Sequence, residues 1–382
     1  MTDFFHYDEL TWPEIDALPR GTPLVLPLGN GYPLDRLTDL VGAPSLLGWL
    51  PAFPFGWPGS GLEVPLGELE AVLTNLRAGL LEEGFSHIYF LAPPDVKLGL
   101  ENTLKLPKIG SDKHSPWLPP EGEQGKVVLA PIGHTEQHGY HLPMSTDTLI
   151  IEAIGAGVAN AVPDQVTLLP AMPYGVSTHR ASFAGTLNVG GRAFEDFWLG
   201  AIDTLVARGF DRMYLISGHG GNCSFLVTVV KYAGEKHRRT FCATAWLYLS
   251  SAEGVDVLQK LRKSPRGGMG HACELETSLI LHLRPDLVHM QRAVDEMNFV
   301  STQNYYMDWV EGGALLANPP WDDDTVTGAY GAGSLATVAN GRAWLEAAIE
   351  EKTGHITEIH TQHVCREARR NANYGEWGKI KR

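Results

Sequence analysis

The chain has 382 residues, 44% of them hydrophobic and 19% charged, so its length favours two or more domains and its composition is that of a globular protein. Its formal net charge is −14, and the nearest approach to a basic run is residues 236–239, which argues against nucleic acid as a partner because phosphate binding needs a positive surface. The first residues do not resemble a signal peptide, and no stretch approaches the roughly 18 apolar residues of a membrane span. The four cysteines are widely spaced, which is typical of reduced thiols. We therefore predict a cytoplasmic protein with no membrane partner.

The first part of the chain divides into three segments. Residues 1–20 are expected to form an irregular or short helical lead, and residues 21–100 alternate strand-like and helical runs. Residues 101–125 are expected to be a linker, because they are rich in Pro, Lys, Ser and Gly and lack periodicity.

The second part, residues 126–382, begins with a strongly apolar run from Lys126 to Gly133. Further apolar runs of strand length cover residues 166–170 and 212–217, and between them the apolar residues of 194–208 recur at helical spacing. Strand–helix–strand alternation predicts an α/β fold with three layers, helix–sheet–helix, and a mainly parallel sheet. Catalytic groups then belong at the carboxyl ends of the strands.

An internal repeat links the two parts, since three segments match in the same order. The matching pairs are residues 23–29 with 127–133, residues 50–56 with 169–175, and residues 83–91 with 208–215. We therefore predict that residues 1–100 form a degenerate copy of a catalytic domain at 126–382. Chance similarity between two α/β segments is the alternative. The aromatic cluster at Trp49, Phe53, Phe55 and Trp57 is expected to pack in a core or domain interface, with a cover for the active site as the alternative.

The residues from Gly133 to Asp147 follow the buried strand and contain three histidines and two acids. Glu136 and His138 are two apart, so in an extended segment their side chains point the same way. Asp147 begins the next element and can fold back toward them. Carboxylate and imidazole together suit zinc, manganese or iron. The corresponding part of the N-terminal copy, residues 29–33, has no such groups.

Two further clusters follow later apolar runs. His219 lies between glycines directly after the strand at 212–217, where a second metal ligand or a phosphate cradle are both possible. His271, Glu274 and Glu276 open a predicted helix. His271 and Glu274 could share a site, whereas Glu274 and Glu276 cannot lie on one helical face and should differ in role.

Together these segments resemble the creatininase family of amidohydrolases over roughly residues 126–350. Residues 135–148 resemble the family's first signature, residues 218–222 its second, and residues 271–278 its third, with Cys273 where glycine is usual. Residues 173–186 resemble the loop that borders the site, and residues 327–337 resemble a C-terminal glycine-rich turn.

This resemblance implies two divalent metal ions (Zn, Mn or Fe) and a small-molecule substrate. It implies that Glu136 and His219 hold one ion and that His138 and Glu276 hold the other, with Asp147 bridging them. It further implies that His271 assists proton transfer, that Tyr174, His179 and His141 face the substrate, and that the protein is a homo-oligomer. Gly221 stands where the family has a catalytic glutamate, and Glu274 is our candidate to replace it.

Three functions follow from these residues. The leading prediction is hydrolysis of a C–N bond in a small polar amide or formamide, cyclic by preference, by metal-activated water. The second is hydrolytic C–C ring opening of a cyclic polyol-derived diketone of the inosose type. The third is a non-catalytic metal-binding scaffold. In the family that the chain resembles, creatininase itself has a catalytic glutamate at the position of Gly221 and a tryptophan before His271 that packs on creatinine. Both are absent here, which argues against creatinine as the substrate.

Overall fold

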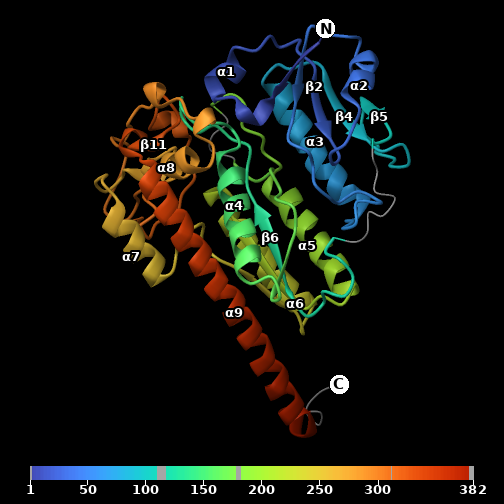
Figure 1. Cartoon of the computed structure of the whole chain (residues 1–382), viewed down its shortest axis with the longest axis vertical. Helices are drawn as coiled ribbons and strands as arrows, with labels where there is room; N and C mark the ends of the chain where they lie inside the picture. Colours follow the sequence, from blue (N-terminus) through green and yellow to red (C-terminus); the bar gives the residue numbers. More distant parts are fainter. Residues whose placement is uncertain (1, 110–117, 178–181, 311, 378–382) are drawn as a thin grey trace.

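The computed structural model describes residues 2–109, 118–177, 182–310 and 312–377. It consists of two parallel sheets, each flanked by helices, with a long C-terminal helix that extends beyond the body (Figure 1). The predicted α/β class with parallel sheets is confirmed. Among the described residues, short 3₁₀ helices cover Tyr7–Glu9, Pro285–Leu287, Met290–Arg292, Trp321–Asp323 and Gly333–Leu335.

The N-terminal sheet has the strand order β1-β3-β2-β4-β5, with every neighbouring pair parallel. Its strands are β1 (Asp3–His6), β2 (Leu24–Pro27), β3 (Leu46–Trp49), β4 (Ile88–Ala92) and β5 (Thr103–Lys105), and its helices are α1 (Trp12–Asp16), α2 (Leu34–Leu40) and α3 (Leu66–Glu82). Two strands correct the sequence-based expectations, since β1 lies in the predicted lead and β5 in the predicted linker. Both are short edge strands, whose pairing depends on the neighbouring strand more than on their own sequence.

The second sheet has the order β7-β6-β8-β9, again all parallel. Its strands are β6 (Val127–Ile132), β7 (Val166–Leu168), β8 (Arg212–Ser217) and β9 (Phe241–Thr244), and a small antiparallel pair is formed by β10 (Met269–His271) and β11 (Tyr330–Gly331). The helices are α4 (Thr146–Ala161), α5 (Gly191–Ala207), α6 (Gly220–Lys236), α7 (Ala252–Leu261), α8 (Glu274–Leu283) and α9 (Val338–Trp377). The strands expected from the apolar runs are therefore present.

Alternating side chains of the second sheet enter two different cores. Val128 and Met213 belong to the core that contains α5 and α6, whereas Val127 and Tyr214 belong to the core that contains α4, α8 and α9. The first core continues through α3, which packs on α5, to the N-terminal sheet. The two sheets are thus joined by a shared helical layer, which makes the N-terminal region an integral part of the body.

The two sheets repeat each other's connections. The order β3-β2-β4-β5 corresponds strand by strand to β7-β6-β8-β9. After β2, the Gly29 N–H donates to the Phe53 carbonyl at 2.8 Å, and after β6 the Gly133 N–H donates to the Met172 carbonyl at 2.8 Å. These correspondences support our proposal that residues 1–100 are a related unit without metal ligands.

Aromatic side chains fasten the two units together. Phe53 stacks on Tyr174, with ring centroids 5.6 Å apart and planes at 15°, and meets Phe197 edge-on at 5.5 Å. The Tyr174 hydroxyl donates to the Pro51 carbonyl at 2.5 Å. The Trp12 indole N–H also donates across the boundary, to the Thr327 carbonyl at 2.8 Å. This supports interface packing for Phe53 over a role as an active-site cover.

Glu83 is a half-buried acid at the same boundary. Its Oε1 accepts the Gly185 N–H at 2.7 Å, and Gly185 lies in the segment that resembles the loop bordering the family's site. Burial raises the pKa of the Glu83 carboxyl from 4.5 to about 7, against the opposing effects of the Gly185 hydrogen bond and Arg20. A group with a raised folded-state pKa binds more protons in the folded protein than in the unfolded chain between these two values.

We therefore expect stability to fall as pH rises from 4.5 to 7, and Glu83→Gln to remove that part of the dependence. The shift corresponds to roughly 3 kcal/mol between the two ends of this window. Urea unfolding at pH 5 and pH 8 measures it, with the exposed neighbour Glu82→Gln as control. Parallel pH profiles of the wild type and Glu83→Gln would contradict the expectation.

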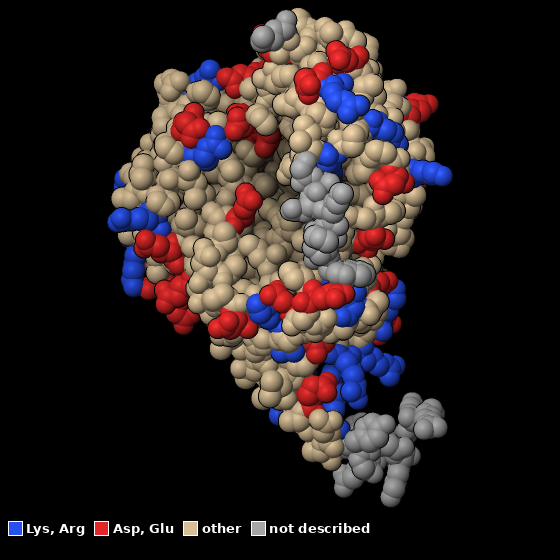
Figure 2. Space-filling view, turned by 45° about the vertical axis from the view of Figure 1, so that its right-hand side comes forward, with Lys and Arg blue, Asp and Glu red and all other residues tan. Residues whose placement is uncertain are grey.

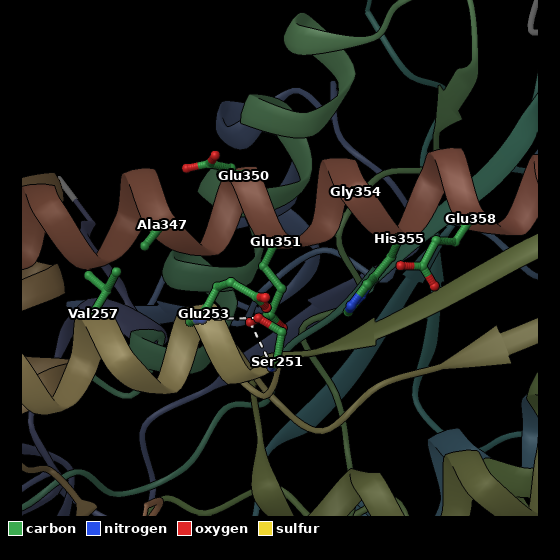
Figure 3. Close-up of a pocket in the computed structure, with 10 residues that line it drawn as sticks. Ser251, Glu253, Val257, Ala347, Glu350, Glu351, Gly354, His355 and Glu358 are labelled. Atoms are coloured by element: carbon green, nitrogen blue, oxygen red, sulfur yellow. Dashed lines mark hydrogen bonds between the residues drawn. The ribbon is translucent and has the colours of Figure 1, made fainter.

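The C-terminal helix α9 packs against the second sheet. Its residue Glu351 accepts the Ser250 N–H at 3.0 Å and the Ser251 N–H at 2.9 Å, just before α7. Figure 3 shows Glu351 beside Ser251. The adjacent Lys352 ammonium is wholly buried and lies 2.6 Å from the Glu351 carboxylate. Burial opposes the charge on Glu351, but Lys352 and these N–H groups lower its pKa to about 2.

The exposed surface carries acidic and basic side chains interspersed with each other on the face drawn in Figure 2. This agrees with the acidic net charge and with the absence of long basic runs in the sequence. In the described part of the chain, no helix combines the length and the apolar character needed to cross a membrane.

Candidate metal centre

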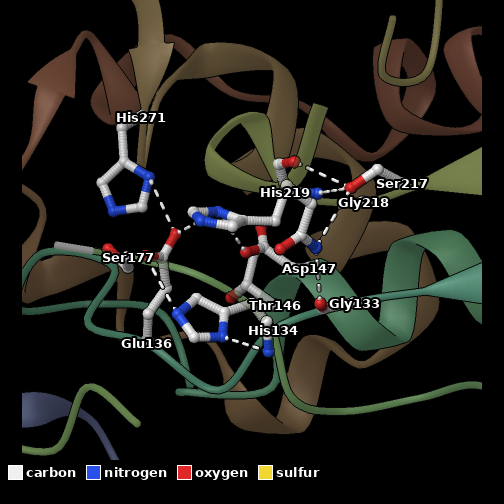
Figure 4. Close-up of polar contacts among 12 residues, drawn as sticks. Gly133, His134, Glu136, Thr146, Asp147, Ser177, Ser217, Gly218, His219 and His271 are labelled. Atoms are coloured by element: carbon white, nitrogen blue, oxygen red, sulfur yellow. Dashed lines mark hydrogen bonds and ion pairs between the residues drawn. The ribbon is translucent and has the colours of Figure 1, made fainter. Parts of the chain in front are cut away.

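Seven metal-capable side chains of the described residues meet at the carboxyl end of the second sheet, and Figure 4 shows part of this cluster. One of them, His134, lies in the segment that follows β6. Glu136 and His138 lie in the segment that follows β6, and His219 directly follows β8. The others come from the last residue of β10 and the first turns of two helices: His271, Asp147 in α4 and Glu276 in α8. All seven are buried, so the polypeptide removes them from bulk water.

Asp147 lies between two histidines. Its Oδ1 is 3.1 Å from His138 Nε2, and its Oδ2 is 3.2 Å from His219 Nδ1. His219 Nδ1 is also 2.9 Å from Glu136 Oε1. Glu276 completes the other side, because it offers an oxygen within 4.8 Å of ligand atoms of His138 and Asp147. A carboxylate with one oxygen toward each imidazole suits a bridging role.

Backbone carbonyls orient three of the imidazoles. His138 Nδ1 lies 3.0 Å from the Glu136 carbonyl, His219 Nε2 lies 2.9 Å from the Val176 carbonyl, and His271 Nε2 lies 2.7 Å from the Gln137 carbonyl. A carbonyl can only accept, so each of these nitrogens carries a hydrogen, and in the neutral ring the other nitrogen presents a lone pair to the cluster. Metal-binding histidines are oriented in this way by their second nitrogen.

The buried acids and histidines of the cluster shift one another's pKa values. Burial favours the protonated acid, but His138 and His219 outweigh it and hold the pKa of Asp147 well below its usual value. Burial likewise opposes charge on His138, while Asp147 and Glu276 raise its pKa above the ordinary value. Three carboxylates, together with His138 and His219 in their neutral form, make a donor set that fits zinc, manganese or iron, and divalent cations would neutralise the buried acids.

Glu274 requires a correction. Its two carboxylate oxygens accept the N–H groups of Lys263, at 2.9 and 3.1 Å, and of Ser264, at 2.8 Å. The carboxylate is therefore engaged in holding the segment after α7, although the side chain begins α8 beside the centre. The helical spacing that separates Glu274 from Glu276 directs only Glu276 into the cluster. We do not propose a catalytic role for Glu274.

Substitution of these two glutamates should give opposite results. We expect Glu274→Ala to destabilise the protein by about 1–3 kcal/mol, because it leaves the buried Ser264 N–H and its neighbour without an acceptor, while metal content is unchanged. We expect Glu276→Ala to lower metal content with a smaller change in unfolding free energy. Elemental analysis and chemical denaturation of both variants measure this. Metal loss in Glu274→Ala alone would reverse the assignment.

The three residues predicted to face the substrate have different positions. Tyr174 has its hydroxyl bonded to the N-terminal unit, so it fastens the interface and does not present that group to a substrate. His141 is wholly buried, with Nε2 2.9 Å from the Thr277 hydroxyl, and burial, followed by repulsion from His138, lowers its pKa to about 4. We propose that His141 supports the first turn of α8. His179 lies outside the described residues.

Two residues near the centre received no role from the sequence. His134 lies 4.5 Å from His219 between ring centroids, and Trp321 meets His271 edge-on at 5.0 Å. His134 stood in the cluster from Gly133 to Asp147, but nothing in its spacing separated it from the other histidines. Trp321 lies shortly before the turn at 327–337 but belongs to none of the motifs, so only the tertiary structure reveals its position beside His271.

Comparison with known proteins agrees with this geometry. The family model for creatininase, described as creatinine amidohydrolase, matches residues 116–356. A mycofactocin precursor peptide peptidase from Mycobacterium ulcerans is 30% identical over 236 residues, which are 60% of this chain and 84% of that protein. The creatinine amidohydrolase of Pseudomonas putida is 31% identical over 185 residues, which are 44% of this chain and 68% of that protein.

Another relative is named for a different reaction, and two solved structures are similar in fold. The 3-dehydro-scyllo-inosose hydrolase of Thermotoga maritima is 27% identical over 244 residues, which are 61% of this chain and 74% of that protein. A manganese creatininase structure aligns with a TM-score of 0.52 at 24% identity, over 61% of this chain and 91% of that one. A creatininase variant of Zn–Zn type aligns with a TM-score of 0.51 at 25% identity, over 61% and 90%. The chain therefore belongs to the creatininase family of metal-dependent amidohydrolases.

Proposed function

We propose that the protein hydrolyses a C–N bond in a small polar amide or formamide, with cyclic amides as the first candidates. The observation that carries this is the position of Asp147, whose two oxygens face His138 and His219 within a buried set of further carboxylates and imidazoles. Two of the three kinds of relatives, the amidohydrolase and the peptidase, bear names that denote C–N cleavage. The peptidase adds short peptides to the substrates worth testing.

In this proposal, Glu136 and His219 hold one divalent ion, His138 and Glu276 hold the other, and Asp147 reaches both. Bound divalent metal lowers the pKa of water and polarises a carbonyl, which is the chemistry that amide hydrolysis needs. Zinc, manganese and iron are the candidate ions, and the donor set is compatible with all three.

The chain's own residues would handle the proton. His271 presents Nδ1 toward the centre, 3.8 Å from Glu136 Oε1, because its Nε2 is committed to the Gln137 carbonyl. Nδ1 can therefore accept a proton from the attacking water and return it to the departing nitrogen. The water oxygen joins the carbonyl carbon, the C–N bond breaks, and the products are a carboxylic acid and an amine. Gly221 leaves no acid in the turn after β8 for this role.

The second candidate is hydrolytic C–C ring opening of an inosose-type diketone. The inosose hydrolase relative favours it, since its similarity extends over 61% of this chain. The same centre would then polarise a ketone, and carbon would leave in place of nitrogen. A non-catalytic scaffold is disfavoured by the complete set of clustered side chains.

One experiment tests the proposal and separates the candidates. Protein purified without chelator is expected to contain about two transition-metal ions per chain by elemental analysis. Screening it with cyclic amides, formamides, short peptides and cyclic diketones is expected to release amine or ammonia together with a carboxylate. A new carboxylate without amine would favour the diketone reaction. Failure to retain metal, even after zinc or manganese is added, would contradict the proposal.

We also propose, from the family resemblance, a homo-oligomer in the cytoplasm. A fused N-terminal unit that already covers α5 through α3 could replace one contact between subunits, so the assembly would be smaller than one built from single units. Light scattering of the purified protein measures its size.

A further inference from the structure

His134 and His219 lie side by side at the centre but make different backbone contacts. Both rings are buried, with centroids 4.5 Å apart and planes inclined at 36°. The difference arises because Gly175 contacts the His134 ring, whereas the next residue, Val176, contacts the His219 ring. Figure 4 shows both histidines turned toward Glu136.

The Val176 carbonyl sets the tautomer of His219. It lies 2.9 Å from Nε2, so Nε2 carries the hydrogen and Nδ1 presents its lone pair to Glu136 and Asp147. The Gly175 N–H sets His134 in the opposite way. It donates to Nδ1 at 3.0 Å, so in the neutral ring Nε2 carries the hydrogen. That nitrogen lies 3.8 Å from Glu136 Oε2, the oxygen on the other side of the carboxylate from His219.

The segment that makes these contacts is fixed in place by Asn222. Its Oδ1 accepts the Val176 N–H at 2.9 Å, and its Nδ2 donates to the Gly133 carbonyl at 3.1 Å. A Cβ on Gly175 would lie 2.4 Å from Asn222 Oδ1, and a Cβ on Gly221 would lie 2.3 Å from the Val176 oxygen. Glycine is therefore needed at both positions for the backbone to approach the two rings this closely.

We infer that His134 is a positioning residue whose Nε2–H group faces Glu136 Oε2 and keeps Glu136 Oε1 directed toward His219. At 3.8 Å this is an oriented N–H dipole facing a carboxylate, longer than a hydrogen bond. The inference rests on the proposed metal centre, and it assigns His134 outside the ligand set.

The competing assignment makes His134 a metal ligand, because His134, Glu136 and His219 each offer an atom within 4.8 Å of the others. Coordination through Nε2 would move the hydrogen to Nδ1, where it would oppose the Gly175 N–H. The buried N–H would then lose its acceptor, which is as costly as leaving any buried donor unsatisfied. The geometry therefore favours an Nε2–H group directed at Glu136 over coordination.

The test reads the tautomer directly. In protein labelled with ¹⁵N-histidine, long-range ¹H–¹⁵N NMR is expected to show His134 protonated at Nε2 both without metal and after zinc loading, with His134→Asn used only to assign the signals. Loss of the Nε2 proton on zinc loading would show coordination and overturn the inference. The metal-free spectrum tests the tautomer even if no substrate is ever found, so the inference can fail independently of the proposed function.

Two substitutions then separate the effect of the N–H group that faces Glu136 from the effect of side-chain packing. Asparagine can accept the Gly175 N–H but lacks a donor at the Nε2 position, whereas glutamine can place an amide N–H there. Zinc affinity, measured by competition with a chromophoric chelator, is expected to fall by about 10- to 100-fold in His134→Asn and by clearly less in His134→Gln. Metal content at saturating zinc should be unchanged in both. Equal losses in the two variants, or no loss in His134→Asn, would overturn the inference.

Discussion

Replacement of Asp147 by asparagine is expected to reduce hydrolysis by about 10³-fold or more, because the centre would lose the group that faces both halves of the site. The change is nearly isosteric, so the packing at the start of α4 should be retained. It removes one negative charge, and an amide nitrogen would face either His138 or His219. We expect the metal content to fall by at least one ion per chain, measured by elemental analysis alongside the rate.

Glu152→Gln provides the matched control, because Glu152 lies on the same helix but is exposed. It removes the same charge and should leave both the rate and the metal content unchanged. Normal metal content with lost activity in Asp147→Asn would assign Asp147 to catalysis without binding. Normal values of both would refute the bridging role.

The sequence predicts where the metal centre lies better than it predicts which residues take part in it. The apolar runs that become β6 and β8 place Glu136, His138 and His219 at the same edge of a parallel sheet. That prediction requires only that the two runs form parallel strands, because the carboxyl ends of parallel strands lie at the same edge of a sheet. The roles of Glu274 and Tyr174 depended instead on contacts with residues far away in sequence. Spacing cannot reveal that a backbone N–H of Ser264 or a carbonyl of Pro51 will reach them.

The same distinction applies to the fold. Apolar runs predicted β6, β7 and β8, and the central strands β6 and β8 are the most completely buried of the sheet. The edge strand β9, whose residues are half-buried, was not predicted. The edge strands β1 and β5 were missed, since each is short and gains its conformation from one neighbour. Repeated segments of sequence led to the expectation of two related units, and the shared strand order supports that proposal. The aromatic contacts between the units could not be read from either segment alone.

Phe53→Ala is expected to destabilise the whole body by about 3–5 kcal/mol, which is typical of a fully buried phenylalanine replaced by alanine. Its ring packs on both Tyr174 and Phe197, so the cavity would open between the N-terminal unit and the catalytic unit. Phe4→Ala is the matched control, because the Phe4 ring is 38% exposed on the edge strand β1, and we expect a loss of less than about 1 kcal/mol there.

Whether the two units unfold in one transition or in two shows whether the metal centre depends on the N-terminal unit. Because one hydrophobic core runs from the N-terminal sheet through α3 and α5 to β6, the two units should unfold together in the wild type. Metal release, far-ultraviolet circular dichroism and tryptophan fluorescence should then share one denaturant midpoint. In Phe53→Ala that midpoint should fall for all three probes. If metal release kept its original midpoint while the other signals shifted, the N-terminal unit would be an independent attachment, and the metal centre would not depend on it.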